Sequence, residues 1–326
     1  MALLNAVRIS TSDGLCTIQS TDLDTFLEAT APAEGALSPT WIALSRLMPF
    51  VSGESTTIEN DGKIRVSAQG RGVFPVMDTK TTDAWPTQPP TGMVLNLDPL
   101  LLSHALTTVA HAVSHESTRM NLTGIHVQAV AGVCRVEAAD GRRMCIVEFP
   151  CEPEVACNFV VQPQSAVLSE VLTKEATITL GNSYLCVQAP GRKVWARLMD
   201  VEYPKFKDAI ARVAFQTVGE FDRDALIDAL TLAASVSTDV FTGIVMRMTA
   251  NVGVTFSGVS DTGTADSSVD GVCALNGAIK FDPQFAIDAL GKMEGMVTVG
   301  YADKVSPLKL TQGNVTAFCM PMCLPE

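Results

Sequence analysis

The sequence predicts an α+β protein in which one arrangement of antiparallel strands and helices is used three times. Three segments indicate this repeat, because each places an apolar residue, a polar residue and a proline before apolar residues at helical spacing: Leu37-Ser38-Pro39, Val161-Gln162-Pro163 and Phe281-Asp282-Pro283. Proline suits the first helical position, where its missing N–H has no intrahelical acceptor in any case. The three prolines lie 124 and 120 residues apart, so the repeating unit is a whole domain rather than a solenoid repeat.

Helices are expected after each of these prolines, over residues 39–47, 163–172 and 283–293. A second pair of helices has the same period. Asp98 and Asp222, which are 124 residues apart, are suited to cap helix N-termini, and they predict helices over residues 99–113 and 223–234. The matching helix of the first domain would fall before residue 1, so we expect that domain to lack its first strand and helix.

Alternating apolar residues between the helices predict antiparallel hairpins. Ser12-Asp13-Gly14 and Asp61-Gly62 supply the turns of the first two, since glycine adopts the positive φ of a tight turn. The six expected hairpins cover residues 7–17, 58–66, 125–136, 178–186, 244–256 and 297–310. A proline-rich stretch at 85–90 and a turn-rich stretch at 211–219 mark domain boundaries. The predicted domains are therefore residues 1–92, 93–213 and 214–326.

The composition is that of a chain with large cores: 47% of its 326 residues are hydrophobic and only 18% are charged, which excludes a disordered chain. No apolar run approaches the roughly 20 residues that cross a bilayer, and the first residues lack the features of a signal peptide. We therefore expect a soluble, cytoplasmic protein that does not bind membranes. The net charge of −12 argues against a nucleic-acid-binding protein that relies on overall positive charge, but it is compatible with one inner face that meets DNA.

The nine cysteines, an odd number without a CxxC pair, sit mostly in apolar or alternating segments. In a chain of this size they are expected to be small buried hydrophobes rather than a disulfide framework. Cys145, Cys151 and Cys157 are spaced by six, which fits no common zinc pattern. The sequence has no phosphate-binding loop, and we expect no cofactor.

Four segments carry a resemblance to a known family. They are Ser117–Ile125, Glu137–Met144, Ala196–Phe206 and Met320–Leu324, the last of which reads Met-Pro-Met-Cys-Leu. In this order, and inside a threefold repeat, they resemble the bacterial DNA polymerase III β subunit, the sliding clamp, over almost the whole chain. The chain departs from the family's pattern where Cys323 stands for a common Arg and Ala139 for a common Thr, and Pro325-Glu326 extends past the usual end.

The resemblance implies three similar domains per subunit and two subunits closed head to tail into a ring, with helices lining the hole and sheets outside. Such a homodimer is a processivity factor and not an enzyme: it encircles double-stranded DNA without sequence specificity and tethers the DNA polymerase and other partners. A clamp-loader ATPase would open the ring. Because the expected missing segment puts ring stability in doubt, a clamp-like adaptor that binds partner peptides without closing a stable ring is the chief alternative.

By the same resemblance, partners insert a short, partly apolar peptide into a pocket between the second and third domains. The matching positions are Leu122, Gly141, Arg142, Arg143, Met144, Pro204, Phe241, Val305, Pro307, Met320, Pro321 and Met322. Methionines adapt to different apolar ligands, and Arg143 is suited to meet a polar or acidic group of the peptide. The alternative interpretation is that these residues are ordinary core together with a turn glycine.

Two further sets of residues follow from the resemblance. The expected DNA-binding residues are Arg46, His104, His111, Arg119, Lys174, Arg223 and Lys292. The expected dimer-interface residues are Phe74, Val76 and Val236. The alternative interpretation of the DNA-binding residues is that they are solubilising surface groups. The alternative interpretation of the dimer-interface residues is that they are core side chains.

The histidines allow a competing interpretation. His104, His111 and His115 fall at i, i+7 and i+11 on the polar side of their predicted helix, with Thr108 on the same stripe. His111, His115 and Glu116 are suited to hold zinc, which would indicate a metal-dependent hydrolase, although the HExxH order is absent. In a clamp the same stripe would line the channel, and otherwise it is a solvated face.

Overall fold

The computed structural model describes residues 6–51, 55–68, 70–75, 92–163, 167–238, 243–261 and 263–323. The chain divides into two compact units. Unit 1 comprises residues 1–103 and 164–199, and unit 2 comprises residues 104–163 and 200–326. Within the described ranges, none of the helices combines the length and the hydropathy that crossing a bilayer requires.

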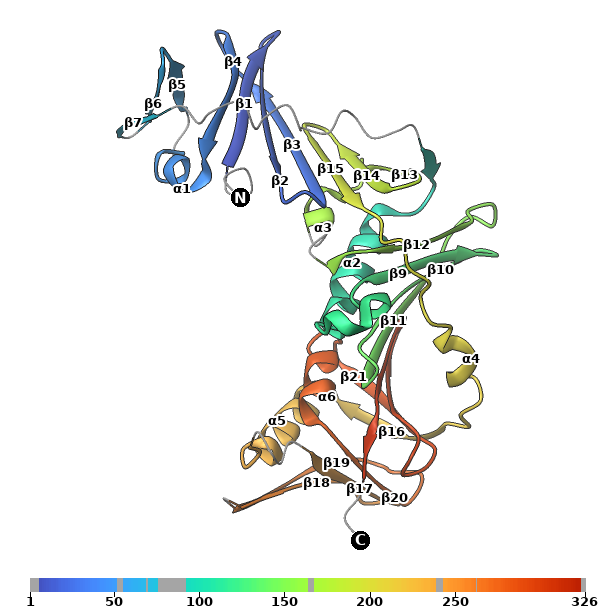
Figure 1. The fold of residues 1–326 in the computed structure, drawn as a ribbon. Helices are drawn as coiled ribbons and strands as arrows, with labels where there is room; N and C mark the ends of the chain where they lie inside the picture. The colour runs from blue at the N-terminus through green and yellow to red at the C-terminus, as the bar shows by residue number, and fades with distance from the viewer. Residues whose placement is uncertain are drawn as a thin grey trace. The chain divides into compact units, whose positions relative to one another are not determined.

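Unit 1 contains an eight-stranded antiparallel sheet and a three-stranded one (Figure 1). The large sheet has the order β4 (Leu37–Ala43), β1 (Ala6–Ser12), β2 (Leu15–Thr21), β3 (Thr25–Pro32), β15 (Arg192–Arg197), β14 (Tyr184–Ala189), β13 (Thr177–Leu180), β8 (Met93–Leu95). The small sheet consists of β5 (Thr57–Asn60), β6 (Lys63–Ser67) and β7 (Arg71–Pro75). The short helical segments of unit 1 are α1 (Leu44–Leu47), the 3₁₀ turn η2 (Met48–Phe50) and α3 (Val167–Val171).

Unit 2 contains a second eight-stranded sheet, in the order β12 (Cys157–Val161), β9 (Ile125–Val130), β10 (Val133–Ala139), β11 (Arg143–Pro150), β23 (Val315–Cys319), β22 (Leu308–Gln312), β21 (Met296–Tyr301), β16 (Gln216–Asp222). A five-stranded sheet follows the order β19 (Gly263–Asp270), β18 (Gly253–Ser260), β17 (Ile244–Thr249), β20 (Gly277–Phe281), β24 (Pro321–Met322). Apart from α3, the helical segments that the structure describes after residue 98 are α2 (Pro99–Val109), η4 (Ala110–Ala112), η5 (Ser117–Leu122), α4 (Phe206–Ile210), α5 (Arg223–Ala234) and α6 (Pro283–Leu290).

Each large sheet is assembled from two runs of strands that lie far apart in the sequence. In unit 1 the runs meet at β3 and β15, where Phe26 is paired with Trp195. In unit 2 they meet at β11 and β23, where Cys145 is paired with Ala317. Antiparallel sheets with few helices confirm the predicted α+β class. The division into domains at residues 92 and 213 stays a prediction.

All six predicted hairpins are confirmed, as β1–β2, β5–β6, β9–β10, β13–β14, β17–β18 and β21–β22. The predicted caps are confirmed as well. A carboxylate oxygen of Asp98 accepts hydrogen bonds from the Leu100 and Leu101 amides, and Asp222 accepts one from Ala225. Asp282, beside Pro283, accepts a hydrogen bond from Gln284. Local signals of this kind are readable because they act within one turn of chain.

The helix predicted over residues 39–47 is wrong for most of its length. Residues 37–43 form strand β4, and helix α1 covers only residues 44–47. Trp41 and Ile42 are both buried, and Ile42 pairs with Val7 of β1. A β-branched and aromatic segment that is covered on both faces favours a strand over a helix. The helix predicted over 163–172 is described only as α3, five residues long.

All nine cysteines are free, as predicted. Five of them are buried: Cys134, Cys145, Cys157, Cys273 and Cys319. Burial raises the pKa of the Cys145 and Cys319 thiols to about 12, so both stay protonated at neutral pH. They therefore act as small core residues rather than as nucleophiles.

A buried polar network ties three strands of unit 2 together. The Nδ1–H of His126 (β9) donates to Glu137 (β10) at 2.9 Å, and its Nε2 lies 2.7 Å from the side-chain oxygen of Asn158 (β12). The Nε–H of Arg135 donates to the second oxygen of Glu137 at 2.7 Å. The ring of Tyr203 stacks on His126 with centroids 4.6 Å apart. The network thus also holds the chain that follows β15 against the sheet.

The charge state of Glu137 depends on these partners. Burial on its own raises the pKa of this carboxyl, but the hydrogen bond from His126 and the charge and hydrogen bond of Arg135 outweigh it, so the pKa lies below the ordinary value of 4.5. A carboxyl whose pKa is depressed in the folded state stabilises the fold above its unfolded pKa. That contribution is lost as the pH falls through the folded value.

We predict that Glu137→Gln lowers the free energy of unfolding by about 1–3 kcal/mol at pH 7, because Arg135 loses a buried ionic partner. The deficit should shrink as the pH falls from the ordinary pKa of 4.5 through the lower folded value, because the wild-type carboxyl then becomes protonated as well. Urea unfolding followed by circular dichroism at pH 7 and pH 3.5 measures both values. Glu148→Gln is the matched control, since Glu148 pairs with the same arginine but its side chain is 49% exposed. Equal effects of the two substitutions would contradict the prediction.

Candidate functional site

The candidate site lies where β11 meets β23. Arg143 pairs with Cys319 and Met144 with Phe318 in this antiparallel ladder. One step further along, the Met320 amide donates to the Arg142 carbonyl oxygen at 2.7 Å. This register brings two of the predicted segments, residues 141–144 and 320–322, side by side.

The last described strand then changes sheets. Pro321 and Met322 form β24, which pairs with Phe281 and Lys280 of β20. The Met322 sulfur lies over Gly243, 2.8 Å from the position where a Cβ atom on that glycine would stand. Any larger residue at position 243 would therefore displace Met322. Glycine here lets the methionine side chain rest against the backbone of the five-stranded sheet.

The predicted pocket residues divide into exposed and buried ones. Met320 is 44% exposed, Met322 38% and Val305 72%. Met144 is only 6% exposed, and it joins a core cluster with Phe318 that Phe206, Ile210 and Phe215 cover. Met144 is therefore part of the floor beneath the site rather than a contact surface.

The remaining predicted residues border this region. Leu122 is buried at the end of η5. Pro204 is half-buried just before α4, in the segment that covers Met144. Pro307 is half-buried and precedes Leu308, which pairs with Cys319 at the end of β23. Phe241 lies outside the described residues.

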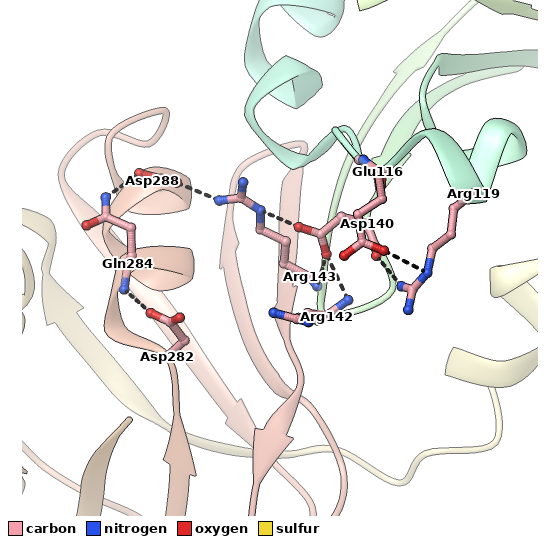
Figure 2. Close-up of polar contacts among 9 residues, drawn as sticks. Glu116, Arg119, Asp140, Arg142, Arg143, Asp282, Gln284 and Asp288 are labelled. Atoms are coloured by element: carbon pink, nitrogen blue, oxygen red, sulfur yellow. Dashed lines mark hydrogen bonds and ion pairs between the residues drawn. The ribbon is translucent and has the colours of Figure 1, made fainter. Parts of the chain in front are cut away.

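A tight turn at Asp140-Gly141 shapes the start of β11 (Figure 2). The Oδ1 atom of Asp140 accepts hydrogen bonds from the amides of Arg142 and Arg143, at 2.8 and 2.9 Å. Gly141 has φ of +88°, and a Cβ atom there would lie 2.5 Å from Nη1 of Arg119. That guanidinium donates to the Asp140 carbonyl oxygen at 2.8 Å. The positive φ favours glycine at this position, and a larger residue would also displace the Arg119 guanidinium.

Arg143 is a structural tie rather than a free cation. Its Nε–H donates to Asp140 at 3.0 Å, and its Nη1–H donates to Asp288 of α6 (Figure 2). The guanidinium carbon also lies 4.9 Å from the ring centre of Phe285. The side chain is only 14% exposed. These contacts occupy the group that was predicted to meet a peptide, and they fasten β11 to α6 instead.

Arg142 is in the opposite situation. Its backbone is held by Asp140 and Met320, whereas its side chain is exposed and makes no hydrogen bond or ion pair within the part of the chain that the structure describes. Nearby, burial raises the pKa of Asp282; the Gln284 amide and the Arg143 and Arg142 guanidiniums oppose that rise, and Asp288 adds to it. Asp282 and Asp288 are not among the site residues that the sequence predicts, because no local pattern indicates that α6 packs beside β11.

The predicted histidine stripe is wrong in part. Helix α2 ends at Val109, and after the η4 turn Val113 is extended, with φ −67° and ψ 142°. His115 therefore does not continue the helical face. Thr108 is buried at 3% exposure rather than lying on the polar side. His104 is exposed on α2.

His111 is partly buried, and its Nδ1–H donates to the Thr108 carbonyl oxygen at 2.8 Å. Burial lowers the pKa of its imidazole, the Arg143 and Lys292 charges lower it further, and the Thr108 hydrogen bond and Asp288 oppose the shift. Among the residues with a described position, no three potential metal ligands gather in one place. The zinc interpretation thus has no geometric support.

The predicted DNA-binding cations differ in how free they are. Arg46, Lys174 and Lys292 are exposed. Arg223 forms an ion pair with Asp224 and donates to the Leu290 carbonyl oxygen, which joins α5 to α6. Arg119 is held by Asp140 and by Glu116, at 3.3 Å.

The predicted dimer-interface residues are only partly described. Phe74, in β7, packs edge-on against Phe50 with ring centroids 5.6 Å apart. Val236 is half-buried after α5, and Val76 lies outside the described residues. The role of these residues in an interface stays a prediction.

Comparison with known proteins agrees with this architecture. Residues 96–205 match the family model described as DNA polymerase III beta subunit, central domain. The beta sliding clamp of Chlamydia trachomatis is 24% identical over 294 residues, which cover 84% of this chain and 66% of that protein. The chain thus spans about two thirds of that relative. The Streptomyces coelicolor beta sliding clamp is 21% identical over 314 residues, covering 90% and 82%.

Solved structures share the fold over nearly the whole chain. The DNA polymerase III beta subunit of Thermotoga maritima has a TM-score of 0.88 at 20% identity, covering 99% of this chain and 92% of that one. The DNA polymerase sliding clamp of Pseudomonas aeruginosa, solved with a ligand, has a TM-score of 0.87 at 18% identity, covering 99% and 93%.

We predict that Arg143→Met lowers the free energy of unfolding by about 2–3 kcal/mol, because Asp140 and Asp288 lose their shared partner. Arg142→Met, one residue away, should change it by less than about 0.5 kcal/mol, since that side chain is exposed. Urea unfolding at pH 7.5 measures both. A double-mutant cycle with Asp288→Asn should give a coupling energy of about 1–2 kcal/mol. Additive effects of Arg143→Met and Asp288→Asn on the free energy of unfolding would show that the Arg143–Asp288 contact is not formed in solution.

Proposed function

We propose that the chain is a member of the bacterial DNA polymerase III beta subunit family and acts as a sliding clamp. In this role it is a non-catalytic processivity factor that encircles duplex DNA and tethers a replicative polymerase. The observation that carries the proposal is the match of fold over 99% of the chain to solved clamps, together with the family match over residues 96–205.

Tethering explains how a protein without catalytic activity promotes replication. A partner held on the same DNA rebinds its primer at a high effective concentration, and no new sequence-specific contact is needed. Contacts to DNA in such a ring must be weak and independent of sequence. A net charge of −12 with a few exposed cations, Arg46, Lys174 and Lys292 among them, suits loose phosphate contacts that water can mediate.

We assign ring closure to a second copy of this chain, through the edge that includes Phe74 and Val76 and the region around Val236. Opening would require a loader ATPase, and the site of action would be the cytoplasm. The second candidate is a clamp-like adaptor that binds partner peptides as a monomer.

The oligomeric state separates these two functions. For a clamp we expect a mass twice that of the 34.6 kDa chain, constant by light scattering from high to low micromolar concentration. Protein bound to a nicked circular plasmid after long incubation should stay bound through gel filtration and be lost when the plasmid is cut, because a ring slides off an open end. A monomer that is retained equally on circular and linear DNA of the same length would refute the clamp.

The exposed methionines are the proposed peptide-binding surface. We expect Met320→Ala with Met322→Ala to weaken binding of a blocked, fluorescent octapeptide with a central Leu-Phe pair by about 10-fold or more, as apolar contacts of roughly 1 kcal/mol each are removed. Deletion of residues 320–326 should abolish binding. Fluorescence anisotropy measures the affinity. Met120→Ala is the matched control, because Met120 is 65% exposed elsewhere in unit 2. Unchanged affinity in the double variant would refute this site.

A further inference from the structure

Two cations flank the exposed methionines of the C-terminal segment. Arg142 is directly opposite Met320, whose amide donates to the Arg142 carbonyl oxygen at 2.7 Å. Lys280 is the ladder partner of Met322 in the pairing of β20 with β24. The Met322 sulfur and the Lys280 side chain both reach within 2.8 Å of the Cβ position above Gly243. Each of the two methionines is thus paired through its backbone with a cationic residue.

Neither cation has an ionic partner of its own. Within the described ranges, the side chains of Arg142 and Lys280 make no hydrogen bond or salt bridge. The carboxylates nearest to Arg142 are engaged elsewhere. Asp140 is held by Arg143 and by two backbone amides, and Asp282 by the Gln284 amide.

Some of the other arginines of the molecule are paired with acids, while other cations, Arg46, Lys174 and Lys292 among them, are exposed. The chain carries 35 acidic and 23 basic residues, so carboxylates are in excess. Arg65, Arg135, Arg143, Arg197 and Arg223 all form ion pairs with them. Arg142 and Lys280 differ from the other exposed cations in that they pair with Met320 and Met322, so an acidic group next to an apolar ligand on these methionines would meet a positive charge.

We propose that Arg142 and Lys280 select the partner peptide by binding the carboxylate of an acidic side chain next to its apolar residues. The inference rests on the proposed peptide-binding function of Met320 and Met322 and adds the chemistry of the ligand. Methionine side chains adapt to aliphatic and aromatic groups, and a guanidinium can bind a carboxylate through two parallel hydrogen bonds. The occupant is therefore an apolar segment with an adjacent Glu or Asp. Arg143 does not contribute, because Asp140 and Asp288 already occupy it.

The test uses three blocked octapeptides that share a central Leu-Phe pair and differ at the flanking positions, which are Glu, Gln or Lys. Wild-type protein in low salt should bind the Glu peptide about 5- to 10-fold more tightly than the Gln peptide and the Lys peptide most weakly. In Arg142→Gln and in Lys280→Gln the preference for Glu over Gln should fall at least threefold, while affinity for the Gln peptide stays within twofold. Arg192→Gln, the same charge change at an exposed residue of unit 1, should leave all three affinities as in the wild type.

The possible failures are distinguishable. Tight binding of all three peptides without a preference for Glu would overturn this inference and leave the proposed peptide surface intact. Binding of none of them would overturn both. If Arg142→Gln and Lys280→Gln leave the preference unchanged but weaken binding to duplex DNA, the two cations contact phosphates and the inference is also wrong.

Discussion

The pairing of β11 with β23 is the contact on which unit 2 depends. It joins strands β9–β12 to strands β21–β23 in one sheet, although β11 and β23 lie far apart in the sequence. Arg143 strengthens it from the side by binding Asp140 on its own turn and Asp288 on α6. Removing one partner of such a pair leaves a charge that burial has made costly. The β11–β23 pairing also sets the geometry of the candidate site, because the Met320 amide donates to the Arg142 carbonyl oxygen at the end of this ladder.

The joint also divides two neighbouring arginines into different roles. Arg143 is the first residue of β11 and is enclosed by Asp140, Asp288 and Phe285. Arg142 precedes the strand, in the turn that Asp140 holds, and its side chain remains exposed. Two identical residues in adjacent positions thus have different surroundings, one enclosed by acids and the other exposed. Composition and motif alone do not separate them.

Much of the fold was predictable because its signals are local. Asp98, Asp222 and Asp282 cap helices within one turn of chain, and the turns at Gly14 and Gly62 close hairpins. The helix prediction for residues 39–47 was wrong because residues 37–43 pair with β1 as a strand, despite the helical spacing of their apolar residues. The predicted histidine stripe was wrong in part because α2 ends at Val109, and beyond it the Ser114 amide donates to the Leu122 carbonyl oxygen. The resemblance indicated Met320 and Met322, but Asp288 and Lys280 enter the site through strand and helix packing across distant segments, which no local pattern encodes.

The long separation between β11 and β23 has a consequence for synthesis. A ribosome completes β11 at residue 150 but does not make its neighbour until residue 315, so the β11 edge must wait with its amides and carbonyls unsatisfied. An open edge next to Cys145, Ile146 and Val147 is a template for pairing with another nascent chain. Production of this protein should therefore be limited less by the stability of the finished fold than by how well this edge is shielded while translation proceeds.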